Sequence, residues 1–369
     1  MLHRLEPSRS AFHWAQAPDC LRRQLAAIAS FPRAAHGGEP AGLTGGAPTV
    51  ERLRRRTLPT LVALAVSGGI LWWLLSSPGA HGLVALLSQA TLWPLLLAFL
   101  LVPVIQGLRA WRFSILLFGR TAAPSWSMFV VAVRLILFNF LLPFKLGEAT
   151  FPVMTQRAFG TAISHSVGAL TLVRLLDFGV VAALLLLAAA MALPDRAQIP
   201  QELLMIGGAL LLVLTLLLPR MVGGLRRAAR RLGWQVVDRG FQSAVTLEQT
   251  MPRALVMVST LAIWILQAMV GWLAATAAFH GIGPAATTFA AASANLAFAL
   301  PVPTIAGLGP PQAAWVMALD LTAIPWAAAV ATALTCHAVQ FLGALMLGFL
   351  TWVAPIWLPP SSVRPTGAC

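Results

Sequence analysis

The sequence predicts an all-α polytopic membrane protein with about six membrane crossings and two re-entrant helical hairpins of opposite orientation. The chain is 59% hydrophobic and only 10% charged, with a mean hydropathy of +0.82, whereas about a quarter of the residues of a soluble domain are charged. Apolar runs long enough to span a bilayer alternate with short polar turns. Two further apolar segments, at about 126–159 and 286–321, are interrupted by proline and glycine. Interrupted segments of this kind, one in each half of a chain, are typical of membrane transporters.

The amino-terminal part is expected to lie in the cytoplasm. Residues 1–50 mix Arg, Pro, Gly and Ala without a clear period, which predicts a mobile tail. Four arginines, Arg52, Arg54, Arg55 and Arg56, then precede the first apolar run at 58–75. Because basic residues flank the cytoplasmic ends of membrane helices, this run should leave the cytoplasm. The transmembrane domain is predicted to cover 51–356, followed by a short tail at 357–369.

The next two segments introduce basic residues at membrane depth. A second span at 83–105 runs into Arg109 and Arg112, which lie three residues apart and should share one helix face at the inner interface. A third apolar segment, 126–142, is closed by Pro143. It is followed by 144–159, which contains Lys145, the only lysine in the chain.

The loop at 219–253 indicates the topology. It carries seven arginines against two acidic residues, so it should be cytoplasmic. That placement requires 126–159 to enter from the cytoplasm, turn near Lys145 and return, rather than cross. The remaining predicted apolar segments are 167–193, 203–218, 255–279, 287–300, 310–321 and 326–352.

A second interruption, 300–311, has the sequence Leu-Pro-Val-Pro-Thr-Ile-Ala-Gly-Leu-Gly-Pro-Pro. The apolar residues around it are too few for two full spans, so 286–321 is interpreted as a hairpin entered from outside. Both termini are then cytoplasmic. Pro310 and Pro311 suit the first turn of a helix that starts at this break.

Ionisable residues within or beside the apolar segments should share a polar interior, because each costs roughly 2.5–3.5 kcal/mol at a helix centre. Arg174 and Asp177 can pair locally along one helix, either only to let that helix pack or to line a path. Lys145 and Glu148 either mark an ordinary helix start after Pro143 or form a site for an anionic headgroup. The predicted binding residues are Arg109, Arg112, Arg134, Asn139, Pro143, Lys145, Gly147, Glu148, Arg157, Arg174, Asp177, Pro303, Gly307, Gly309 and Gln312.

The net charge of +14 comes almost wholly from arginine. Several arginines cluster beside hydrophobic spans, which indicates contact with anionic inner-leaflet lipid and not with nucleic acid. Within the basic loop, apolar residues recur near helical spacing over 225–250, so this stretch is either an amphipathic helix on the membrane surface or a simple topogenic loop.

The sequence shows no pattern typical of catalysis. The seven histidines lie far apart, no His, Cys or carboxylate spacing matches a metal site, and no phosphate-binding loop or nucleophile elbow is present. Cys20, Cys336 and Cys369 are too few and scattered for a disulfide framework. We therefore expect no catalytic residue, no metal and no cofactor.

Four motifs in order resemble a known family. They are 109–113 (Arg-Ala-Trp-Arg-Phe), 139–148 with its Pro-x-x-x-Gly-Glu pattern, Arg174-x-x-Asp177, and 301–309. Over about 58–355 the chain resembles the flippase-like transmembrane domain of lysylphosphatidylglycerol synthases and its stand-alone relatives. The resemblance implies a multi-pass protein of the bacterial inner membrane that moves a lipid between leaflets, and some stand-alone relatives are associated with hopanoids.

Two departures from the family pattern bear on the substrate. Phe151 stands where relatives often have a basic residue, and Gln312 where they often have a glutamate. Both changes suggest a less charged substrate, such as a hopanoid. Two alternatives remain: a membrane-embedded lipid-modifying transferase using Glu148 or Asp177 as a base, and a non-transporting partner of lipid-biosynthesis enzymes. An oligomer is compatible with either function.

Overall fold

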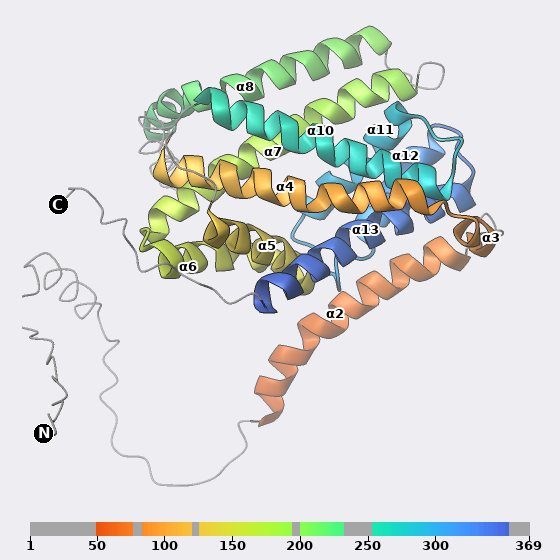
Figure 1. The fold of residues 1–369 in the computed structure, drawn as a ribbon, viewed down its shortest axis with the longest axis horizontal. Coiled ribbons are helices and arrows are strands. Elements are labelled where there is room, and N and C mark those ends of the chain that lie inside the picture. Colours follow the sequence, from red (N-terminus) through yellow and green to blue (C-terminus); the bar gives the residue numbers. More distant parts are fainter. Residues whose placement is uncertain (1–48, 77–82, 120–124, 194–199, 232–252, 354–369) are drawn as a thin grey trace, which may run out of the picture. The chain divides into compact units, whose positions relative to one another are not determined.

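The computed structural model describes residues 49–76, 83–119, 125–193, 200–231 and 253–353. Every element in these ranges is helical, and from Glu51 onward they belong to one compact unit (Figure 1). The predicted tails at 1–50 and 357–369 lie outside the described residues, except that helix α2 already begins at Thr49.

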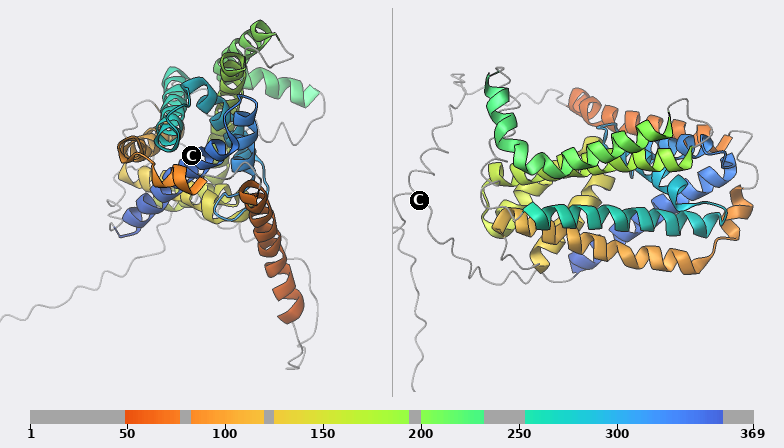
Figure 2. Two further views of the ribbon diagram at one scale, coloured as in Figure 1. Left: turned by 90° about the vertical axis from the view of Figure 1, so that its right-hand side faces the viewer. Right: turned by 90° about the horizontal axis from the view of Figure 1, so that it is seen from above.

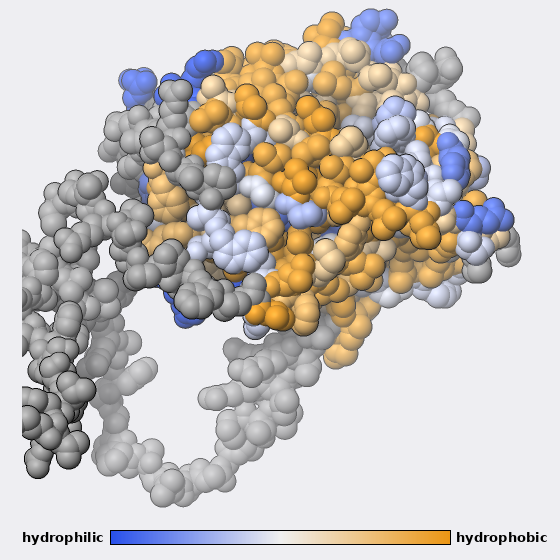
Figure 3. All heavy atoms as spheres, viewed as in Figure 1, coloured by the Kyte–Doolittle hydropathy of each residue, from blue (hydrophilic) through white to orange (hydrophobic). Residues whose placement is uncertain are grey.

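Five described helices are long and apolar enough to cross a membrane, and α2 contributes a shorter apolar helix. The five are α4 (Leu92–Phe118), α7 (Ile163–Ala192), the Gln201–Leu218 part of α8 (Gln201–Arg231), α10 (Arg253–Ala278) and α13 (Trp326–Val353). The apolar part of α2 (Thr49–Ser76) covers Leu61–Ser76. The visible face of the molecule is largely apolar (Figure 3), and side chains such as Leu100, Phe349 and Trp352 are exposed on the described surface. These features identify a multi-pass membrane protein.

The helices differ in length from the predicted spans. The span expected at 83–105 is split into α3 (Leu83–Ser88) and α4, and α4 continues past Pro103 through Arg109 and Arg112 to Phe118. The span expected at 203–218 corresponds to the apolar part of α8, and the helix continues beyond it through Pro219 to Arg231, with a bend in its ribbon (Figure 2). Proline lacks the amide hydrogen and clashes with the preceding turn, so a helix can bend there without ending. Most of the predicted surface helix at 225–250 lies outside the described residues.

Two helical hairpins were correctly predicted. The first joins α5 (Trp126–Leu141) to α6 (Gly147–Phe159) through a short 3-10 turn at Pro143–Lys145. The second joins α11 (Pro284–Ala299) to α12 (Pro310–Asp320). In each hairpin the two helices pack against each other.

The hairpins start from opposite ends of α4. Phe159, at the end of α6, packs on Phe118 at the carboxyl end of α4, with ring centroids 5.2 Å apart. At the other end, the Thr91 amide donates to the carbonyl of Ala277, near the residue where α10 leads into α11 (3.0 Å). Because α4 is 27 residues, or about 40 Å, long, the bases of the hairpins lie far apart and their tips point toward each other (Figure 1).

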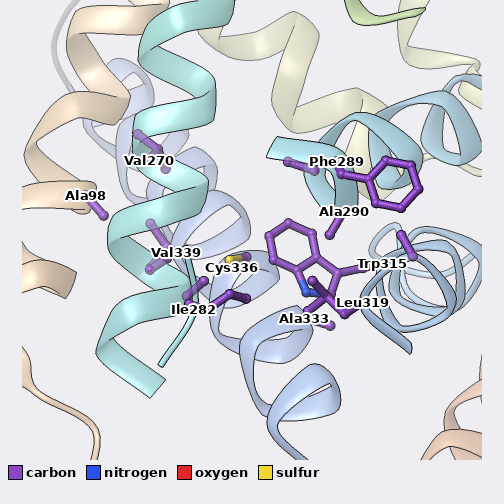
Figure 4. Packing of buried hydrophobic residues seen from close by; sticks show 14 of the residues in the cluster. Ala98, Val270, Ile282, Phe289, Ala290, Trp315, Leu319, Ala333, Cys336 and Val339 are labelled. Carbon is purple, nitrogen blue, oxygen red and sulfur yellow. The ribbon is translucent and has the colours of Figure 1, made fainter. Parts of the chain in front are cut away.

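The buried apolar side chains form two clusters. One joins α4, α10, α11, α12 and α13 around Trp315 (Figure 4). The indole N–H of Trp315 donates to the Thr332 hydroxyl (3.0 Å). The other joins α4, α5, α6 and α7 around Phe113, Phe151 and Leu176. Between them lies the space described next.

Candidate functional site

The tip of the first hairpin brings Lys145 out of regular helix. Phe144 and Lys145 have φ angles of 55° and 58°, in the left-handed region that costs non-glycine residues of order 1–3 kcal/mol each. Behind the tip, Gly147 lies so close to α5 that an added Cβ would be 2.5 Å from both the backbone nitrogen and Oδ1 of Asn139. The Pro143 break and the glycine together let α6 start directly beside the end of α5.

The turn of the second hairpin is held by α2. The Ser67 hydroxyl donates to the Leu308 carbonyl (2.9 Å) and accepts from the Ile305 amide (3.0 Å). Gly307 and Gly309 have φ angles of 69° and 111°, which glycine adopts without steric penalty. The Gln312 Oε1 accepts from the Gly309 amide (2.7 Å) and so caps the start of α12.

The two tips meet. The Lys145 Nζ lies 2.9 Å from the centroid of the Phe298 ring, near the end of α11. Phe140, near the end of α5, packs on the same ring with centroids 5.3 Å apart. The two helix interruptions, which are 150 or more residues apart in the sequence, therefore contact each other in the structure.

A cavity of about 540 Å³ lies beside these tips. It is bounded by α4, α5, α6, α7, α10, α11, α12 and α13 and by both hairpin turns. Its polar lining side chains are Gln106, Arg109, Arg112, Asn139, Lys145, Glu148, Thr171, Arg174, Asp177, Trp264, Gln267, Asn295, Gln312, His337 and Gln340. A charged cavity of this size within an apolar helix bundle is typical of a substrate site or pathway.

Arg112 and Asp177 form the most buried ion pair of the cavity wall. The Arg112 Nη1 and Nη2 donate to the two carboxylate oxygens of Asp177 at 2.7 and 3.0 Å. Trp264 donates to the same carboxylate at 3.0 Å, and Thr260 accepts from Arg112 at 3.0 Å. Bidentate geometry and these extra hydrogen bonds are what a buried charge pair needs to offset its desolvation.

A second ion pair lies nearer the cavity opening. The Arg174 Nε is 2.8 Å from the Glu148 Oε1, and the side chains are 41% and 32% exposed. The predicted local pair between Arg174 and Asp177 is present only at 3.8 Å. Arg174 therefore lies closer to Glu148 on α6 than to Asp177 one turn away on its own helix, and Asp177 lies closer to Arg112 on α4 than to Arg174.

Arg109 begins a chain of side-chain amides across the cavity. Its Nη2 lies 3.4 Å from the Gln267 Oε1, and Gln267 donates in turn to Gln340 at 3.0 Å. No carboxylate lies within ion-pair distance of Arg109 or Lys145 among the described residues. The described residues of the lining include four basic and two acidic side chains, so among them positive charge exceeds negative charge by two.

The structure brings together most, but not all, of the predicted binding residues. Those lining the cavity are Arg109, Arg112, Asn139, Lys145, Glu148, Arg174, Asp177, Gly307 and Gln312. Pro143, Gly147, Pro303 and Gly309 belong to the hairpins and their turns.

Arg134 and Arg157 lie away from the cavity, and their role in binding stays a prediction. Arg134 donates to the Thr351 carbonyl (3.3 Å) and lies over the Trp352 ring. Arg157 is exposed in the last turn of α6. Arg112 also differs from its predicted place at the interface, since it is 1% exposed in the bundle interior.

The neutral part of the lining was not predicted. Gln106, Gln267 and Gln340 are amides inside apolar helices, and charge alone did not single them out. His337 also lines the cavity. Polar residues inside helices that are otherwise apolar could have signalled these positions.

The two departures from the family pattern lie in different environments. Phe151 is fully buried against Phe113, with ring centroids 4.4 Å apart, and is not among the cavity-lining residues. Gln312 does line the cavity. Only the second position therefore bears directly on the charge of the site.

The rim of the cavity is apolar and open. Leu175 and Phe178 on α7 and Leu300 after α11 line it, and they are 39%, 57% and 57% exposed. Polar groups inside with exposed apolar groups at the edge match the two ends of a lipid molecule.

Comparison with protein families gives a match to the family described as the lysylphosphatidylglycerol synthase TM region, over residues 60–348. No curated protein and no solved structure matches the chain.

Proposed function

The chain belongs to the lysylphosphatidylglycerol synthase TM-region family, and on that basis and that of its cavity we propose that it is a lipid translocase. The observation that carries the proposal is the polar cavity where the two hairpin tips meet, which has exposed apolar side chains at its rim. A headgroup can enter the cavity while its acyl or terpenoid tail stays in the bilayer against Leu175 and Phe178.

The arrangement of the hairpins supports an alternating route. If α4 spans the membrane, the two hairpins re-enter it from opposite faces, because their bases lie at opposite ends of that helix. Each tip then closes one side of the cavity at membrane depth. Moving one tip from the other would open the cavity to one face at a time, which is how repeats of membrane transporters expose a central site alternately.

The proposed orientation follows from charge. The basic residues at 52–56, before the apolar part of α2, and at 220–231, at the end of α8, support a cytoplasmic location for both segments. With both termini cytoplasmic, the first hairpin faces the cytoplasm and the second the outside. The protein would act in the bacterial inner membrane, on phospholipid-like or hopanoid lipids.

Lipid exchange between leaflets tests the proposal. In proteoliposomes with a panel of labelled lipids, a Lys145→Ala, Glu148→Ala double variant should lower the exchange rate at least about tenfold, equivalent to about 1.4 kcal/mol. Arg157→Ala is the matched control, since it removes an exposed charge from the same hairpin outside the cavity. Equal rates for the wild type and a folded double variant would disprove the proposed route.

A further inference from the structure

We propose that the lipid headgroup is anionic and bears hydroxyl groups, and that it carries no amine. The inference rests on the proposed translocase function and names the substrate class of the same cavity. It excludes an aminoacylated, positively charged headgroup as the preferred substrate. The carboxylates of the cavity contact arginines, two basic groups have no carboxylate partner among the described residues, and unpaired neutral acceptors lie beside them.

Both acidic side chains of the lining are already engaged. Asp177 accepts from Arg112 through both oxygens and from Trp264. Glu148 lies 2.8 Å from Arg174. Among the described lining residues, an ammonium group entering the cavity would therefore compete with Arg112 or Arg174 for a carboxylate and would add to an excess of positive charge.

Gln312, which follows the turn of the second hairpin, does not provide a free acceptor for an amine. Gln312 is 2% exposed, and its Oε1 accepts from the Gly309 amide. The side chain is neutral, and its oxygen is used by the start of α12. The second hairpin therefore offers no charge that would attract a cationic headgroup here.

Two basic side chains are available for an anion. Arg109 has a long contact to the neutral Gln267 (3.4 Å), and Lys145 lies over the neutral Phe298 ring. Both line the same cavity. A phosphate or another anionic ester in this space would gain charge-assisted hydrogen bonds from groups that need not first leave an ion pair.

Neutral acceptors complete the site. Gln106 is 4% exposed, it lines the cavity, and its side-chain oxygen is buried without a hydrogen-bond partner. The Nε2 of His337 is unpartnered as well. Buried polar groups in folded proteins are normally paired, so these atoms point to a ligand with matching groups. A hydroxyl both donates and accepts, and so it satisfies an amide in either orientation.

Exchange and binding of four labelled lipids test the inference with the full chain in proteoliposomes. The panel is phosphatidylglycerol (anionic, hydroxylated), its lysyl ester (cationic), phosphatidylethanolamine (zwitterionic, amine) and a monoglucosyl diacylglycerol (neutral, hydroxylated). We expect phosphatidylglycerol to exchange at least about tenfold faster than each of the others. Faster or equal exchange of the lysyl ester would overturn the exclusion of amines, and equal exchange of the glucolipid would overturn the need for an anion.

A binding measurement tests the headgroup preference independently of transport. If no lipid exchanges, the translocase function fails, and native mass spectrometry of the same panel still decides the headgroup preference. Arg109→Gln and Lys145→Gln should each lower the binding preference for phosphatidylglycerol over the glucolipid, whereas Arg157→Gln should preserve it. Unchanged preference in both cavity variants would overturn the inference.

A soluble anion could fit the same groups. Glycerol 3-phosphate and inorganic phosphate are therefore added as competitors to the binding measurement. We expect them to displace bound phosphatidylglycerol only at concentrations far above those of the lipid, because they lack the tail that contacts the rim. Displacement at equal concentrations would assign the cavity to a soluble anion and overturn the lipid assignment.

Discussion

The Arg112–Asp177 pair shows how single charges are held inside this bundle. Arg112 is among the largest fully buried side chains described, and its partner comes from a helix far away in sequence. Two hydrogen bonds join the pair, and Thr260 and Trp264 add one each. The pair joins α4 to α7 and forms one wall of the cavity.

Removing one member should destabilise the protein strongly. Asp177→Ala leaves Arg112 buried without its counter-charge, which we expect to cost about 3–5 kcal/mol of unfolding free energy. Chemical unfolding in detergent measures the loss. Arg157→Ala, at an exposed position, should change stability by no more than about 0.5 kcal/mol.

A double replacement separates pairing from packing. Arg112→Leu combined with Asp177→Leu removes both charges, and we expect it to be more stable than Asp177→Ala because no unpaired charge remains. If Asp177→Ala unfolds like the wild type, the pair does not stabilise the bundle as described.

At the scale of elements, the first hairpin depends on one close approach. Gly147 leaves room for α6 to pass Asn139, and a Cβ would also come within 2.6 Å of the Phe138 carbonyl carbon. Backbone atoms cannot move aside as a flexible side chain can. The Pro143 turn therefore works only with glycine at this position.

Gly147→Ala should push the two helices of the hairpin apart. We expect a loss of about 1–3 kcal/mol in stability and slower lipid exchange, because Lys145 and Glu148 flank the displaced residue. Gly107→Ala on α4 is the control, since an added Cβ there meets nothing within 4 Å; it should be neutral or stabilising by up to about 1 kcal/mol. Equal effects of the two substitutions would contradict the role given to Gly147.

The helical hairpins could be predicted because each is marked by a clear sequence signal. Proline and glycine inside apolar runs predicted both hairpins, because a broken helix leaves a mark in the sequence itself. The full lengths of α4 and α8 were not predicted, and Pro103 and Pro219 lie inside these continuous helices. Tertiary packing decides whether such a proline bends or ends a helix, and the sequence does not show that packing.

At the scale of the whole molecule, the site exists only because separate helices converge. Arg109, Lys145, Glu148 and Arg174 were predicted as binding residues from their charge, and the structure places all four on one cavity. The ion pair between Arg112 and Asp177 was not predictable, because these residues are 65 positions apart in the sequence. For the same reason the sequence did not show the glutamine chain, or that Arg134 and Arg157 lie away from the cavity.

The contact between the hairpin tips should change during transport. In a cysteine-free background, Phe140→Cys and Phe298→Cys should be joined by a short thiol cross-linker, because the native rings pack on each other. We expect the cross-link to stop lipid exchange by preventing the tips from separating. Phe159→Cys with Phe298→Cys is the control pair, since Phe159 lies at the base of the first hairpin. Full exchange in the cross-linked protein would show that the tips need not part.

The central claim is that lipid headgroups pass through the cavity, and blocking the cavity tests it most directly. In the cysteine-free protein, Ala294→Cys on α11 places a thiol on the lining, whereas Ser164→Cys near the start of α7 places one on the exposed surface away from it. Each is labelled to completion with a bulky methanethiosulfonate reagent, and lipid exchange is measured before and after. We predict that labelling at 294 stops exchange, that reduction of the label restores it, and that labelling at 164 has no effect. Undiminished exchange with 294 fully labelled would show that the lipid takes another path.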